Sequence, residues 1–165
     1  SGAKLDMSTY KDFCKKYEDE ACKFFKDAMN IIDKNYLKEA SQNYKDERVK
    51  ASIALAPGFV QNMTNESLKS IDIPALIVGA QLDHNAPVET VIKSKMKSFS
   101  ESMKYIEIED AAHFSFMQIC TSNASMILKE ENAEFICLDG KYKKRESIHL
   151  ETKKIVKEFL KKIEE

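Results

Sequence analysis

The sequence predicts an α/β fold in which about three parallel strands are flanked by helices. Three short apolar runs, at 49–56, 73–79 and 104–108, have the length and the branched aliphatic content of strands. Polar turns and helical segments separate them, which is typical of parallel strands joined by crossover connections. The carboxyl ends of such strands share one edge of the sheet, where open α/β sheets bind ligands.

The composition predicts a globular protein and excludes several classes of partner. A length of 165 residues suits one domain with a real core, and 43% hydrophobic with 32% charged residues is unlike a disordered chain. The formal net charge is −1 and the charges are interspersed, so nucleic acid and anionic membranes are not predicted partners. No apolar run is long enough to span a membrane, and no signal peptide is visible.

The first 47 residues are expected to form a helical, lid-like segment within the single domain 1–165. Apolar side chains recur at helical spacing over 8–32, beginning with Tyr10 and continuing through Met29 and Ile32. A second short helix is predicted over 36–44. Neither helix carries a residue typical of catalysis.

The middle of the chain alternates strands and helices. The run at 49–56 is nearly continuous, which predicts a strand buried on both faces. A helical turn at 65–70 leads to the strand at 73–79, and Pro87 can open a crossover helix that runs to about Phe99. The third strand follows at 104–108.

The last third is expected to be an irregular excursion followed by a long helix. Residues 121–142 show no sustained period and are predicted to contain one short helical piece. Residues 145–163 carry an apolar stripe that predicts packing onto the sheet. The stripe consists of Ile148, Ile155, Val156, Phe159, Leu160 and Ile163.

Asp83 and His113 are the candidate catalytic residues, because each follows a predicted strand and they are thirty residues apart. A carboxylate can orient a histidine, which can then act as general base for a hydroxyl or thiol. Spacing alone leaves open that Asp83 merely caps its turn and that His113 is a surface histidine. His84 is expected to point elsewhere. A metal site that includes His84 is the weaker alternative, and no cofactor is predicted.

Four cysteines fall into two local pairs, Cys14 with Cys22 and Cys120 with Cys137. Their spacing leaves open both free thiols in a cytosolic protein and two short-range disulfides in an oxidising compartment. Eight residues of straight helix span about 12 Å, too far for a disulfide. A bond between Cys14 and Cys22 therefore requires the first helix to break near 18–20.

Three stretches carry a resemblance to a known family: RVKASIALAPGF, SLKSIDIPALIVGAQLDHNAP and YIEIEDAAHFSF. Together they resemble the C-terminal half of the α/β-hydrolases, and more narrowly the bacterial dienelactone hydrolase-like proteins related to platelet-activating-factor acetylhydrolase. The resemblance implies that Asp83 is the acid of a catalytic triad and that His113 is its base. One departure is Ala111-Ala112, where a glycine is usual before the histidine.

The resemblance covers nearly the whole chain, since that family also has paired cysteines near these positions. It implies the disulfides Cys14–Cys22 and Cys120–Cys137 and a secreted or periplasmic protein, with a cytoplasmic one as the alternative. The Gly-x-Ser-x-Gly turn that carries the family's nucleophile does not occur in these 165 residues.

We therefore expect the C-terminal part of a serine hydrolase that acts on small carboxylic esters, inactive without its missing N-terminal half. The alternative is a non-catalytic binding module on a degenerate hydrolase fold. Without the N-terminal half, the strand at 49–56 becomes an open sheet edge, through which the chain is expected to self-associate or to pair with the missing part.

Overall fold

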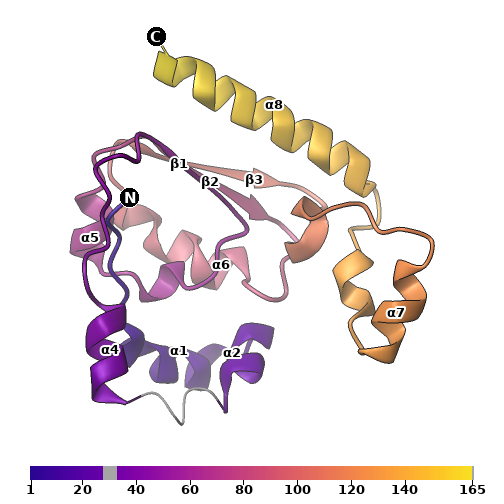
Figure 1. Cartoon of the computed structure of the whole chain (residues 1–165), viewed down its shortest axis with the longest axis horizontal. Coiled ribbons are helices and arrows are strands. Elements are labelled where there is room, and N and C mark those ends of the chain that lie inside the picture. The colour runs from indigo at the N-terminus through magenta and orange to yellow at the C-terminus, as the bar shows by residue number, and fades with distance from the viewer. Residues whose placement is uncertain (28–32, 165) are drawn as a thin grey trace.

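Three parallel strands form the sheet in a computed structural model that describes residues 1–27 and 33–164 (Figure 1). The strands are β1 (Ser52–Leu55), β2 (Ala75–Ala80) and β3 (Met103–Ile108), in the spatial order β1-β2-β3. Helices flank the sheet, so the predicted α/β fold class is confirmed. Met29 and Ile32, predicted to continue the first helix, lie outside the described residues.

The central strand β2 is buried along its whole length, because a strand lies on each side of it and side chains cover both of its faces. On one face α8 (Arg145–Glu164) runs across the sheet (Figure 1). Its Ile148 packs with Leu76 and Val78. On the other face Ile77 packs with side chains of α6 (Val88–Val91). The predicted packing of the last helix is confirmed, although Leu160 is 43% exposed and lies outside the contact.

The strand predicted at 49–56 is shorter and less buried than expected. Its burial alternates, and Ile53 and Leu55 are 37% and 39% exposed. The register aligns these two residues with Leu76 and Val78, so they face the α8 side of the sheet. They remain outside the apolar cluster under α8 because β1 is an edge strand.

The crossover helix is also shorter than predicted. It ends at Val91 and continues as a 3₁₀ segment, Lys93–Ser98, instead of running as one helix to Phe99. The Ser94 hydroxyl donates to the Thr90 carbonyl at 2.6 Å, a local bond that competes with regular helical geometry. Branched side chains in this stretch further weaken the helix.

The N-terminal helices are α1 (Tyr10–Tyr17), α2 (Glu20–Phe25) and α4 (Lys34–Ala40). The break expected near 18–20 is present, with Glu18 in the left-handed region at φ 41°. The helix predicted over 36–44 begins earlier, because the Asp33 side chain caps it by accepting from the Tyr36 amide.

The remaining segments connect these layers. The helical turn predicted at 65–70 is α5 (Asn65–Lys69), and the excursion after β3 contains α7 (Ala124–Glu130). Short 3₁₀ turns lie at Met7–Thr9, Val60–Asn62, His113–Phe116 and Glu134–Cys137. Within 1–27 and 33–164, no helix is long and apolar enough to cross a membrane.

Candidate active site

Asp83 and His113 meet at the carboxyl edge of the sheet. Asp83 follows β2 and His113 follows the adjacent parallel strand β3. His113 Nδ1 lies 2.7 Å from Asp83 Oδ2, within hydrogen-bond distance. The contact expected from the strand–helix–strand spacing is present; the catalytic role of the two residues stays a prediction.

The two carboxylate oxygens of Asp83 have separate partners. Oδ1 accepts from the backbone amides of Asn85 at 2.9 Å and Ala86 at 2.7 Å, while Oδ2 faces His113. The Asp83 side chain is only 1% exposed. Asp83 thus caps its own turn and also holds the His113 ring.

The His113 ring is partly exposed and packs against its neighbour. Its side chain is 25% accessible, and its ring stands edge-on to Phe114 with 4.8 Å between centroids. Because Nδ1 is directed at a carboxylate, it is the nitrogen that carries the proton in the neutral ring. Nε2 is then the nitrogen that can accept a proton, and it makes no hydrogen bond to any residue that the structure describes.

A cleft of about 420 Å³ lies beside His113. Its lining consists of Glu20, Leu82, His84, Asn85, Ala112, His113, Phe114, Phe135, Leu138 and Asp139. Four of these side chains are large and apolar, a lining typical of small-molecule sites. His84, which was expected to point elsewhere, lines this same cleft. None of these lining residues carries a hydroxyl or a thiol.

The serine nearest to His113 in sequence is engaged elsewhere. Ser115 is completely buried, and its hydroxyl donates to Asp139 Oδ1 at 2.5 Å. The same hydroxyl accepts the backbone N–H of Ala112 at 2.9 Å. These bonds fix the 3₁₀ turn that carries His113, which gives Ser115 a structural role.

A buried acid from the N-terminal segment lies near the site. Asp19 is 9% exposed and its side chain accepts from the Cys22 amide at 2.8 Å. Burial raises the pKa of the Asp19 carboxyl, and this effect outweighs the Cys22 amide bond, which lowers it. The neighbouring charges of Glu20 and Asp83 raise the Asp19 pKa further.

Both predicted disulfides, Cys14–Cys22 and Cys120–Cys137, are present. The first joins α1 to α2 across the break at Glu18. The second closes the excursion that carries Phe135 and approaches the cleft. Among the described residues no cluster of three or more His, Cys, Asp or Glu side chains could hold a metal ion.

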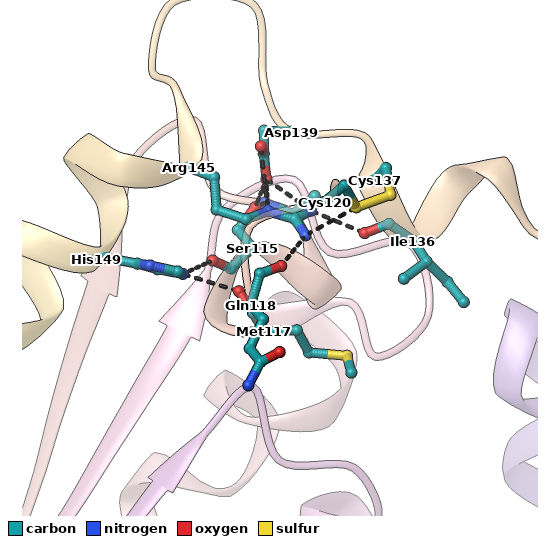
Figure 2. Close-up of polar contacts among 10 residues, drawn as sticks. Ser115, Met117, Gln118, Cys120, Ile136, Cys137, Asp139, Arg145 and His149 are labelled. Atoms are coloured by element: carbon teal, nitrogen blue, oxygen red, sulfur yellow. Dashed lines mark hydrogen bonds and ion pairs between the residues drawn. A yellow bond between two sulfur atoms is a disulfide. The ribbon is translucent and has the colours of Figure 1, made fainter. Parts of the chain in front are cut away.

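The sequence did not point to the residues that hold the His113 turn from α8. From the first turns of that helix, His149 bonds the Ser115 carbonyl of the turn, and Arg145 bonds the Gln118 carbonyl just after it (Figure 2). Their spacing of four residues places them on one helix face. A cation in the first turn opposes the helix dipole, so Arg145 at the predicted helix start was a usable signal of a tertiary role.

Comparisons with known proteins support the α/β-hydrolase resemblance. No family model matches the chain. A segment of 69 residues is 38% identical to cutinase 1 of Thermobifida cellulosilytica and, equally, to a cutinase of Thermobifida fusca. The matches cover 41% of this chain but only 25% and 22% of the two cutinases. The similarity supports the superfamily and does not single out the dienelactone hydrolase-like group.

A crystal structure of the monoacylglycerol lipase of Paleococcus ferrophilus matches over 44% of this chain and 27% of the lipase. Sequence identity over that match is 15% and the TM-score is 0.29, values too low to carry a structural conclusion.

Proposed function

We propose that Asp83 and His113 are the acid and the base of a serine-hydrolase triad that acts on carboxylic esters. The supporting observation is the 2.7 Å contact between Asp83 Oδ2 and His113 Nδ1 at the edge of a parallel sheet. Sequence similarity to cutinases supports an ester hydrolase lineage. The nucleophile is proposed to come from a segment outside these 165 residues, since the apolar-walled cleft holds no hydroxyl or thiol.

The proposed mechanism uses both nitrogens of His113. Nε2 accepts the proton of the nucleophilic hydroxyl as its oxygen attacks the ester carbon, and the ring becomes an imidazolium. The Asp83 carboxylate stabilises that charge through Nδ1–H. The imidazolium then returns the proton to the departing alcohol, and water hydrolyses the acyl intermediate by the same route. Donors for the oxyanion would accompany the nucleophile.

We also propose a subgroup and a cellular location. The dienelactone hydrolase-like subgroup is supported only by the quoted sequence motifs. A secreted or periplasmic location is supported by the two disulfides, which persist in oxidising compartments. A binding module on a degenerate hydrolase fold is the competing function, and the absence of a nucleophile among the cleft residues favours it equally.

The proposal is tested by assaying ester hydrolysis in two proteins, the 165-residue chain and the longest protein whose coding sequence contains it. With a p-nitrophenyl ester, the 165-residue chain is expected to show no turnover above its own His113→Ala variant. The longer protein is expected to be active and to lose about a thousandfold or more with His113→Ala. Arg48→Ala, at an exposed surface ion pair outside the cleft, is the control and should retain activity.

The outcomes distinguish the serine hydrolase from the binding module. Turnover by the 165-residue chain that His113→Ala abolishes would place a nucleophile within it. An active longer protein that tolerates His113→Ala would refute the triad. A longer sequence without a Gly-x-Ser-x-Gly turn, and without activity, would favour the binding module.

A further inference from the structure

Arg145 is a buried cation at the base of the excursion that follows His113. Its side chain is 5% exposed and pairs with Asp139, with 3.1 Å between Nη2 and Oδ1. Asp139 is itself only 15% exposed. A buried ion pair is stable only when its remaining donors and acceptors are also bonded. Those additional bonds show what the pair holds together.

One set of bonds runs from the ion pair to the histidine turn. Asp139 Oδ1 accepts the hydroxyl proton of Ser115, and the Ser115 oxygen accepts the amide of Ala112. Ala112 and Ser115 flank His113 in the chain, so this path fixes both sides of the residue that meets Asp83. His149 adds to it, because its Nε2 donates to the carbonyls of Ser115 at 3.0 Å and Met117 at 2.9 Å (Figure 2).

A second set runs from Arg145 to both ends of the disulfide loop. Nη1 donates to the Gln118 carbonyl at 3.2 Å and contacts Cys120 Sγ at 3.8 Å. Nη2 donates to the Ile136 carbonyl at 2.8 Å (Figure 2). One guanidinium therefore joins the segment leaving the His113 turn to the returning segment. That returning segment contributes two apolar side chains, Phe135 and Leu138, to the cleft.

The returning segment is also bonded to Asp110, which precedes His113 in the chain. The buried Asp110 carboxylate accepts the backbone amides of Lys141, Tyr142 and Lys143. The Asp110 carbonyl accepts the amide of Gly140 at 3.1 Å. Residues 139–143 are thus attached to 110–115 through two carboxylates, that of Asp139 on the returning segment and that of Asp110 before His113.

We propose that Arg145, with Asp139, is a positioning residue that fixes the His113 ring against Asp83 and holds the apolar wall of the cleft beside it. This inference rests on the proposed function, because it concerns the residues that hold the same histidine in place. Its geometry can be tested without any activity. Lysine keeps the charge of Arg145 but cannot reproduce the planar, multiply bonded guanidinium.

The test is proton exchange at His113 Nδ1, followed by nuclear magnetic resonance in the 165-residue chain labelled with ¹⁵N-histidine. Arg145→Lys is expected to accelerate this exchange by about tenfold or more, because hydrogen bonds to a charged group are lost. The backbone amide of Val78, in the buried strand β2, should keep its exchange rate, which separates local release from general destabilisation.

Two further variants keep the test decisive. Ser115→Ala removes the link between Asp139 and the turn while leaving the ion pair, and should reproduce the faster exchange even if Arg145→Lys fails to fold. Arg48→Lys is the matched control, since Arg48 pairs with Asp46 at 2.6 Å on the surface. It should leave the His113 signal unchanged.

Unchanged exchange at His113 in Ser115→Ala and in any folded Arg145→Lys protein would overturn the positioning role, whatever the outcome for esterase activity. In an active longer protein, Ser115→Ala is expected to lower kcat about tenfold with a smaller change in KM. Faster exchange at His113 in these variants, together with a longer protein that shows no esterase activity, would support the positioning role and refute only the proposed function.

Discussion

Asp83 holds His113 with one carboxylate oxygen while its other oxygen closes the turn from which it projects. The histidine contact thus depends on a turn that the same side chain stabilises. Removal of the carboxylate should affect both.

We predict that Asp83→Asn weakens both functions of the side chain and that Asp83→Ala abolishes them. The alanine variant leaves the Ala86 amide without its acceptor in a buried position, which costs about 1–3 kcal/mol. Chemical denaturation measures that loss. The His113 Nδ1 proton signal should disappear from its hydrogen-bonded position in Asp83→Ala. A variant with full stability and an unchanged proton signal would contradict the arrangement.

Gly140 is predicted to be intolerant of any side chain. A Cβ atom there would clash with Asp110 Oδ1 and with the Asp110 carbonyl oxygen, so the backbone would have to move. Gly140→Ala should destabilise the protein by about 1–3 kcal/mol, as overpacking does. Thermal unfolding measures the effect.

Gly58→Ala is its matched control, because a Cβ at Gly58 meets nothing within 4 Å. It should change the stability by no more than about 0.5 kcal/mol, the usual range for surface substitutions. Equal effects at the two glycines would show that contact with Asp110 does not constrain Gly140.

The Cys120–Cys137 disulfide is predicted to be the more stabilising of the two. It closes 17 residues and the other closes eight, and the chain-entropy model gives roughly 3 kcal/mol for a loop of the longer length. Paired serine substitutions at each bridge, compared by denaturation, measure the difference. Non-reducing peptide mapping of protein made in an oxidising compartment should find both bonds, and four alkylatable thiols would contradict them.

Tyr10 is predicted to make the folded protein less stable at high pH. Burial, with the nearby Asp19 charge, raises the pKa of Tyr10 from 10.0 to about 12. The folded state then holds the proton more tightly than the unfolded state. The stabilisation is complete below pH 10 and is lost as the pH rises through about 12.

Ultraviolet titration of tyrosinate checks this shift. Tyr10→Phe should remove one late-titrating group, whereas Tyr142→Phe, at an 82% exposed position, should leave the late titration in place. If both variants remove the same early step, the raised pKa of Tyr10 is refuted.

The edge strand β1 is predicted to drive association of the 165-residue chain. Ile53 and Leu55 are both partly exposed on this strand, and none of the described segments pairs with its outer edge. An apolar, unpaired edge favours pairing with another copy or with the rest of a parent protein. Sedimentation velocity should show self-association that Ile53→Lys weakens.

Ile106→Lys provides the control at the opposite edge strand, β3, where Ile106 is 38% exposed. It should leave the association unchanged. A monomer at all concentrations would contradict the prediction for β1.

The sequence by itself determined the sheet and the approach of Asp83 to His113. A short apolar run bounded by turn residues, such as 73–79, predicts a buried strand, and a parallel crossover brings successive strand ends to one edge. The helix break between Cys14 and Cys22 followed once the family resemblance implied that they are bonded, because a straight helix cannot bring the two sulfurs together.

Only the tertiary structure decided how the site is supported. The partners of Arg145 lie at Asp139, Gln118 and Ile136, and no periodicity relates these positions. Nor did the run at 49–56 reveal that Ile53 and Leu55 would remain half-exposed, since an apolar pattern is the same in a central strand and at an edge. Contacts of this kind depend on which segments the fold places side by side, and residue spacing along the chain does not contain that information.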